Sequence, residues 1–153
     1  MDLGNLETTL VGVAGEYFVA AELSLRGYLA SVTLRNSRGI DIIASNSDAN
    51  KSVSIQVKTN KGGGPSWMFS KKSETFFAKN HFYVLVTLKK DGSRPDFYIV
   101  PSKIVAEDIT SSHQMWLRGT KKDGSRWKDS DLRKFSDPKG TFKEKWENLG
   151  LGL

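Results

Sequence analysis

The sequence predicts one α/β domain that spans residues 1–153, and three observations lead to this prediction. An apolar helical pattern runs from about Thr8 to Arg26, and the next residue, Gly27, is typical of the position after a helix end. The residues that follow form short alternating or apolar runs typical of strands. A chain of 153 residues also has the length of one domain and can bury most of the surface that it exposes when unfolded.

The expected elements follow one another along the chain. After the helix we expect strands over 28–34, 39–44, 54–59, 82–88 and 96–100, a helical or irregular segment over 71–79 and a short C-terminal helix over 142–149. A glycine-rich segment over 60–66 predicts a flexible loop directly after the third strand.

The first predicted helix is apolar on two sides. One stripe consists of Val11, Ala14, Phe18, Ala21 and Leu25. The second consists of Val13, Ala20 and Leu23, and Glu16 falls within it. We therefore expect one side to face the sheet and the other to meet the C-terminal segment or another subunit.

Three polar side chains are expected to converge on the second and third strands. Because side chains two apart share a face of a strand, Gln56 and Lys58 lie side by side, about 7 Å apart. If residues 45–51 close an antiparallel hairpin, Asp41 lies across from them on the same face. A carboxylate, an amide and an ammonium together form a possible site for a divalent metal and a phosphate.

This arrangement resembles the PD-(D/E)XK nuclease superfamily, in which an Asp, a hairpin and then Asp/Glu-x-Lys carry the site. Here Asp41 is followed by Gln56 and Lys58, so Gln stands where most members have Asp or Glu. The helical run that opens with Glu16 and ends before Tyr28 is similar to the first helix of archaeal Holliday-junction resolvases.

The resemblance covers about residues 8–108, since 81–86 and 96–102 are similar to the later strands of small bacterial members. It implies a restriction-endonuclease-like core, with a central mixed sheet of about five strands flanked by helices. It also implies metal-dependent hydrolysis of DNA.

Roles for individual residues follow from the same resemblance. It assigns Mg²⁺ or Mn²⁺ to Asp41, the side chain of Gln56, the backbone carbonyl of Val57 and Glu16, and it assigns the attacking water to Lys58. Catalytic roles are thus expected for Glu16, Asp41, Gln56 and Lys58. Because Gln offers a neutral oxygen, this site has one negative charge fewer than most members.

Each of these residues also has a structural interpretation. Asp41 can be a buried carboxylate capped by hydrogen bonds, and Lys58 can be a charge that protects an edge strand from aggregation. Glu16 can be a solvated helix residue or a partner of Arg26 or Arg38.

The charge of the chain is uneven. Residues 1–50 hold 3 Lys/Arg and 6 Asp/Glu, whereas residues 51–153 hold 20 and 11, which gives the net charge of +6. A basic later half suits a polyanion such as DNA. The expected phosphate contacts are Lys61, Lys71, Lys72, Lys121, Lys122 and Arg126.

One hexapeptide, Lys-Lys-Asp-Gly-Ser-Arg, occurs at 89–94 and again at 121–126. Its Asp-Gly step predicts a turn at both places. The two copies are either solvated basic turns or two tips that contact a nucleic-acid backbone.

Other classes of site find little support. The chain has no cysteine, its two histidines are too far apart for a zinc site, and no run of 18 apolar residues indicates a membrane span. Trp67 follows the glycine loop and is either a core residue or a surface on which a base stacks.

These observations predict a cytoplasmic, Mg²⁺-dependent endonuclease that acts on DNA, has no membrane partner and forms a homo-oligomer, either a dimer or a tetramer. Two alternatives stay open: a nuclease-like protein that binds nucleic acid without cutting it, and a structural or oligomerisation protein.

Overall fold

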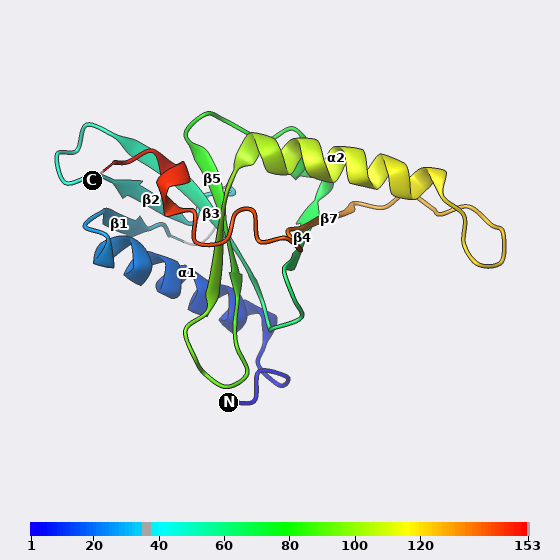
Figure 1. The fold of residues 1–153 in the computed structure, drawn as a ribbon, viewed down its shortest axis with the longest axis horizontal. Coiled ribbons are helices and arrows are strands. Elements are labelled where there is room, and N and C mark those ends of the chain that lie inside the picture. The colour runs from blue at the N-terminus through cyan, green and yellow to red at the C-terminus, as the bar shows by residue number, and fades with distance from the viewer. Residues whose placement is uncertain (35–37, 153) are drawn as a thin grey trace.

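The computed structural model describes residues 1–34 and 38–152, in which helices and a small second sheet lie against a central sheet (Figure 1). Its elements in chain order are α1 (Thr8–Leu25), β1 (Leu29–Val32), β2 (Ile42–Ser45), β3 (Ser52–Asn60), β4 (Ser66–Ser70), the 3-10 helix η1 (Lys71–Glu74), β5 (His81–Thr87), β6 (Asp96–Pro101), α2 (Ser102–Arg118), β7 (Leu132–Ser136) and the 3-10 helix η2 (Trp146–Leu149).

The central sheet is mixed and has the strand order β1-β2-β3-β5-β6. Strands β3 and β5 pair in parallel, and the other neighbours pair antiparallel. A parallel pair needs a crossover connection, and here the crossover contains β4 and η1. The predicted α/β fold with a five-stranded mixed sheet is confirmed.

Helix α1 covers one face of this sheet. Its buried residues recur every four positions and are Val11, Gly15, Val19 and Leu23. The two predicted stripes are therefore wrong in detail, because Val11 and Leu23 come from different stripes and the other two buried residues belong to neither. Phe18 and Leu25 of the first stripe are exposed. Gly15 decides the contact: a Cβ there would lie 1.8 Å from Oγ1 of Thr59 on β3, so the helix backbone rests directly on the strand.

Helix α2 and a two-stranded sheet of β4 and β7 cover the opposite face. Alternate residues of a strand face opposite sides, so β5 contributes Val84 to the α1 side and Tyr83 to the α2 side. Both faces of the central sheet are thus packed. Strands β5 and β6 are buried on both sides, and their sequences are accordingly almost continuously apolar. The sequence did not predict α2, β4 or β7.

Three segments differ in extent from the expected elements. Strand β3 continues through Asn60, whose side-chain amide donates to the carbonyls of Gly64 and Ser66 and so bridges the glycine loop. The 71–79 segment, expected to be helical or irregular, is helical over residues 71–74. Of the predicted C-terminal helix over 142–149, only residues 146–149 are helical.

In the part of the chain that the structure describes, neither helix has the combination of length and hydrophobicity that a bilayer-spanning segment needs.

Candidate active site

Asp41 lies where strand β2 diverges from β3. The pairing of the two strands ends at Ile42 and Ile55, and the Asp41 N–H makes one further backbone bond, to the carbonyl of Ile55 at 2.8 Å. Beyond this point the Asp41 side chain, and not the backbone of β2, is the hydrogen-bond partner of β3: Oδ2 accepts a hydrogen bond from the N–H of Val57 at 2.7 Å. The side chain of Asp41 thus extends the hydrogen bonding along the edge of β3.

The backbone of Val57 faces this same edge. A strand residue in a hydrogen-bonded pair directs both its N–H and its C=O toward the same neighbour. Since the N–H of Val57 points to Asp41, its carbonyl also lies on this edge, beyond the last pair between β2 and β3. A carboxylate and a backbone carbonyl, both hard oxygen donors, share the gap beside β3.

Gln56 and Lys58 lie on the face of β3 that looks toward β4. The Nζ atom of Lys58 is 5.4 Å from the centre of the Phe69 ring, whereas Ile55 is buried on the α1 side. Asp41 comes just before β2, and its carboxylate is close enough to the Lys58 ammonium to affect the pKa of that lysine. Oε1 of Gln56 lies beside Gly39, two residues before Asp41. The structure therefore brings the predicted carboxylate, amide and ammonium to one place.

Burial perturbs both charged groups. It raises the pKa of the Asp41 carboxyl above its usual range, although the Val57 N–H and the nearby Lys58 ammonium act in the opposite direction. Burial also lowers the pKa of Lys58, an effect that the Asp41 carboxylate only partly offsets. Opposed pKa shifts in a close acid–base pair are typical of functional sites.

A pocket of about 690 Å³ opens beside these residues. It is lined by Arg38, Gly39, Gln56, Lys58, Ser70, Lys72, Ser73, Thr75 and Phe76. Among these lining residues, three side chains are cationic and none is acidic, so the pocket suits an anion such as a phosphate.

Gly39 allows the turn before Asp41 to approach the pocket wall closely. Its φ of +62° is in the left-handed region that favours glycine. A Cβ at this position would lie 3.3 Å from the Phe76 ring and 3.5 Å from Oε1 of Gln56. A side chain here would therefore press on the amide that is expected to bind metal.

Glu16 approaches β3 from the opposite face. It follows Gly15, where α1 touches Thr59, and its side chain is half-buried. Gln56 and Lys58 point to the other side of the strand. Among residues 1–34 and 38–152, no three His, Cys, Asp or Glu side chains form a metal-binding group. The predicted ligand set contains only two carboxylates, and the role of Glu16 in it stays a prediction.

The predicted phosphate contacts near the pocket have different surroundings. Lys71 and Lys72 are exposed on η1, and Lys72 lines the pocket. Lys61 instead donates from Nζ to the backbone carbonyls of Gly4 and Leu6, which directs it toward the N-terminal segment.

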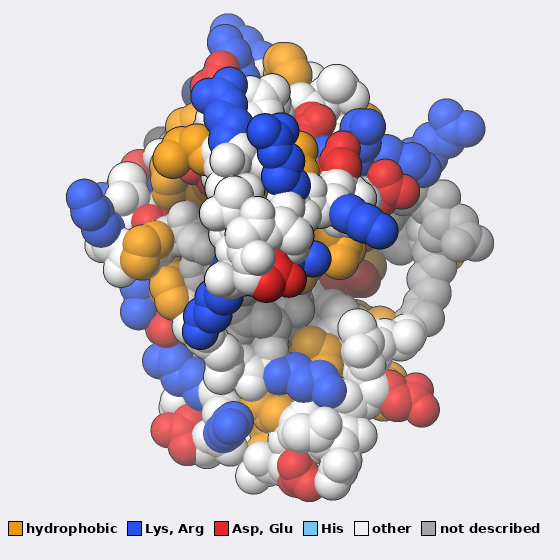
Figure 2. Space-filling view, turned by 90° about the vertical axis from the view of Figure 1, so that its right-hand side faces the viewer, with side chains coloured by type: hydrophobic (Ala, Val, Ile, Leu, Met, Phe, Trp, Pro, Cys, Tyr) orange, Lys and Arg blue, Asp and Glu red, His pale blue; other side chains and the backbone are white. Residues whose placement is uncertain are grey.

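The other three predicted contacts belong to an arm, residues 119–131, that projects beyond the end of α2 (Figure 1). The ring of Trp127 stacks on Trp116 of α2 with a centroid distance of 4.9 Å, and Nζ of Lys121 lies 5.4 Å from the Trp127 ring. Figure 2 looks onto this end of the molecule, where Lys and Arg side chains are spread over the surface. The arm is thus fixed to α2 by an aromatic stack and presents basic residues.

The two copies of the repeated hexapeptide form the same turn in different settings. In each turn the Asp side chain accepts hydrogen bonds from the backbone N–H and the hydroxyl of the Ser two residues later. Arg94 of the first copy is paired with Glu22 and Glu144. Arg126 of the second copy has no ion pair within the described part of the chain, so its charge is available to a ligand.

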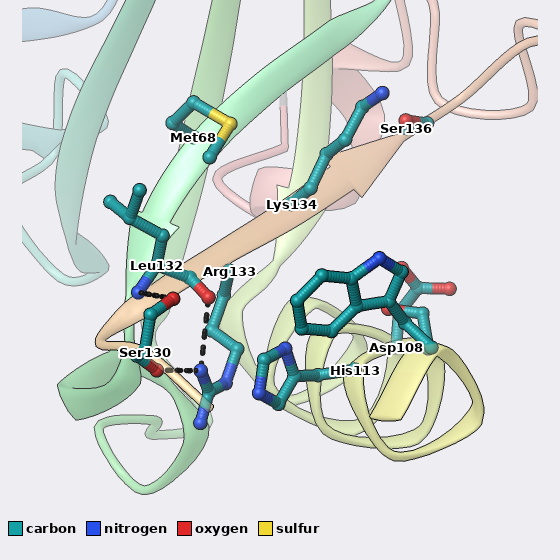
Figure 3. Close-up of a pocket in the computed structure, with 10 residues that line it drawn as sticks. Met68, Asp108, His113, Ser130, Leu132, Arg133, Lys134 and Ser136 are labelled. Atoms are coloured by element: carbon teal, nitrogen blue, oxygen red, sulfur yellow. Dashed lines mark hydrogen bonds between the residues drawn. The ribbon is translucent and has the colours of Figure 1, made fainter. Parts of the chain in front are cut away.

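A second hollow, of about 570 Å³, lies between α2 and the sheet of β4 and β7 (Figure 3). Met68, Leu132 and Lys134 line it from the sheet, and Asp108 and His113 line it from α2. Its walls mix acidic and basic side chains, unlike the cationic pocket beside β3. Burial raises the pKa of the Asp108 carboxyl. No local pattern in the sequence predicts this hollow.

Two residues that line the pocket beside β3, Arg38 and Phe76, were not predicted from the sequence. A basic residue three positions before Asp41 was a usable signal for Arg38, but nothing local indicates Phe76. Trp67 is a core residue and not a stacking surface, because it is buried and its Nε1 donates to the carbonyl of Val86 at 3.0 Å.

Comparisons with known proteins find similarity among solved structures but not among sequences. No protein-family model and no curated protein sequence matches the chain. The structure is similar to the bacterial homing endonuclease I-Ssp6803I, with 13% identity and a TM-score of 0.47 over 67% of this chain and 74% of that one. It is also similar to the Holliday junction resolvase Hjc of Archaeoglobus fulgidus, with 16% identity and a TM-score of 0.45 over 93% of this chain and 89% of that one. Both TM-scores lie below 0.5, so support for a function has to come from the residues of the site.

Proposed function

We propose that this protein is a metal-dependent endonuclease that hydrolyses DNA phosphodiester bonds. One observation supports this most: the Asp41 carboxylate, hydrogen-bonded to the Val57 backbone, and the Lys58 ammonium meet beside a pocket whose charged lining is entirely cationic. Hydrolysis of a phosphodiester needs these three elements, namely oxygen ligands for a metal, a group that handles the attacking water and positive charge around the phosphate.

The oxygen atoms at the edge of β3 suit Mg²⁺ or Mn²⁺. Oδ2 of Asp41 is engaged with the Val57 N–H, so Oδ1 is the carboxylate atom for a metal, and the Val57 carbonyl and the Gln56 amide add neutral oxygens. Hard oxygen donors without any thiolate favour these cations over zinc. A bound Mg²⁺ would polarise the phosphoryl group and lower the pKa of a coordinated water.

Lys58 is suited to handle a proton or to hold a phosphate oxygen. Because burial lowers its pKa, its ammonium releases a proton more readily than a solvated lysine does. Arg38 and Lys72, on the rim of the same pocket, would hold the non-bridging oxygens of the phosphate.

Contacts to the rest of the DNA come from exposed cations. Lys71 and Lys72 flank the pocket, and the arm supplies Lys121, Lys122 and Arg126. Lys61 is the weakest of the predicted contacts because its ammonium is already bound to two carbonyls. We further propose that the protein is cytoplasmic and works as a homo-oligomer.

The experiment is a cleavage assay with purified protein and four substrates: supercoiled, linear, single-stranded and branched DNA. Each is incubated with Mg²⁺, Mn²⁺ or EDTA, and Asp41→Asn serves as the matched inactive variant. Cleavage that needs the metal and Asp41 supports the proposal. Salt-dependent binding with no cleavage by the wild type favours the non-cutting alternative. No binding to any nucleic acid at low salt favours the structural protein.

A further inference from the structure

One flank of α1 carries a row of apolar side chains that nothing in the described structure covers. We call this row the α1 stripe; it consists of Leu10, Ala14, Tyr17, Phe18, Ala21 and Leu25. Its four large side chains are 50%, 66%, 43% and 82% exposed, in chain order. The residues follow spacings of three and four, so they share one side of the helix. A contiguous apolar row of this kind on a surface usually marks an interaction site.

The stripe is free of charge. No Lys or Arg occurs in the 18 residues of α1, and neither of its two Glu residues belongs to the stripe. Glu22 has only 12% of its side chain exposed and is paired with Arg94 and Arg26. A surface without cations does not suit DNA, so the occupant of the stripe is expected to be a protein.

The sequence of the stripe is symmetric about its midpoint, between Tyr17 and Phe18. Leu10 and Leu25 stand at equal distances from that midpoint, as do Ala14 and Ala21. The row therefore reads leucine, alanine, aromatic, aromatic, alanine, leucine in both directions. A two-fold interface requires a patch that is complementary to itself, and an antiparallel pair of these helices meets that requirement.

Packing and electrostatics agree with this pairing. In an antiparallel pair, Ala14 of one copy faces Ala21 of the other, and these small residues let the axes approach to about 8–10 Å. The aromatic residues then meet at the centre and the leucines at both ends.

Antiparallel helix dipoles attract each other. A chain with a net charge of +6 repels a second copy elsewhere, so a charge-free face is the natural place for self-association.

We propose that the α1 stripe binds the same stripe of a second copy of this chain, with the helices antiparallel and the two-fold axis at positions 17 and 18. Under this proposal the expected homo-oligomer is a dimer, and the α1 stripe is its interface. It does not depend on nuclease activity, because the stripe lies away from Gln56 and Lys58 on the far side of β3.

The first test is the molar mass of the full chain in solution, measured by light scattering over a range of protein concentrations. Tyr17→Glu places a charge at the centre of the stripe, where two copies would meet. Met115→Glu is the matched control, since Met115 is an exposed residue near the end of the other long helix. We expect the wild type and Met115→Glu to be dimers and Tyr17→Glu to be a monomer with an unchanged circular dichroism spectrum.

The second test uses the absence of cysteine in the chain. Ala14→Cys protein mixed with Ala21→Cys protein should form a disulfide-linked dimer rapidly on mild oxidation. Ala14→Cys alone should not, because seven residues of helix separate the two equivalent positions by about 10 Å, more than the roughly 7 Å between Cα atoms that a disulfide spans.

Three results would overturn the proposal. They are a monomeric wild type at every concentration, a Tyr17→Glu variant that dimerises as well as the wild type, and faster crosslinking of Ala14→Cys with itself than with Ala21→Cys. Since none of these measurements uses DNA, a failure here is distinct from a failure in the cleavage assay.

Discussion

The backbone N–H of Val57 donates to Oδ2 of Asp41 at 2.7 Å, so one carboxylate oxygen stabilises the fold, and the other is the oxygen proposed to bind the metal. Asp41 therefore has two roles, a structural hydrogen bond and the proposed metal ligand, and two different substitutions are needed to tell them apart. Asn keeps a carbonyl oxygen that can accept the hydrogen bond, whereas Ala removes the acceptor altogether.

We predict that Asp41→Asn and Asp41→Ala both abolish cleavage, because each removes the charge proposed to hold the metal. Only Asp41→Ala should also lose stability, by about 1–3 kcal/mol, since it leaves the Val57 N–H without a partner. Cleavage assays and urea unfolding measure the two effects separately. Full cleavage by either variant would exclude Asp41 from the mechanism.

A second prediction concerns Gln56→Glu. The substitution adds a negative charge among the expected metal ligands, so Mg²⁺ and Mn²⁺ should bind about tenfold more tightly, as an additional 1–2 kcal/mol of charge attraction implies. Calorimetric titration measures this affinity, and Gln56→Met, which removes the amide oxygen, is the control that should bind more weakly. Equal affinities in all three proteins would show that the side chain at 56 does not contact the metal.

The pH dependence of stability provides a third prediction. Because the pKa of Asp41 is raised in the folded protein, the folded state binds the proton more tightly than the unfolded state. Its contribution to stability therefore decreases as the pH rises from the ordinary Asp pKa, about 3.9, through the raised value. Asp41→Asn, which cannot ionise, should be more stable than the wild type at pH 7, and this difference should disappear near pH 3.5. Urea unfolding across this range checks it, and a difference that grows toward acid pH contradicts it.

The repeated hexapeptide offers a fourth prediction with an internal control. Lys122→Gln changes the arm, and Lys90→Gln makes the same change at the same position of the other copy. If the arm contacts a phosphate, Lys122→Gln should reduce the slope of log affinity against log salt by about one unit. Lys90→Gln should leave the slope unchanged. Identical slopes for both variants would remove the arm from the DNA interface.

A fifth prediction tests how α1 is seated on the sheet. Gly15→Ala should destabilise the protein by about 1–3 kcal/mol, because the added methyl group collides with Thr59. Thr59→Ala removes the Oγ1 atom that lies nearest, so part of the loss should be recovered in the double variant. Urea unfolding of the four proteins gives the coupling energy, and simple additivity would mean that the two residues do not press on each other.

The sequence predicted the features that depend on local periodicity. Alternation along β3 separates Ile55 from Gln56 and Lys58, and a short hairpin is enough to bring Asp41 close to Lys58. The hydrogen bond between Asp41 and Val57 was not predictable, because it depends on where β2 diverges from its partner.

The missed elements owe their structure to distant contacts. Strand β7 reads Leu-Arg-Lys-Phe-Ser, and its buried residues Arg133 and Phe135 make sense only once β4 is beside it. Arg133 is then stabilised by Glu74 of η1. Helix α2 is different, because its four buried residues near the start, Ser102, Val105, Ala106 and Ile109, stand three and four positions apart, a pattern that helical periodicity can detect.

The same pairing of β4 with β7 has a consequence for how the protein is made. Strand β4 lies inside the crossover between β3 and β5, but its partner is synthesised more than 60 residues later. On the ribosome, β3 and its Asp41 partner can emerge early, while Ser70 and Lys72 at the pocket wall receive their support only after residues 132–136 have left the exit tunnel. The pocket is therefore completed late in synthesis, and a nascent chain that stops short of β7 would carry the proposed metal ligands without the pocket wall proposed to hold the phosphate.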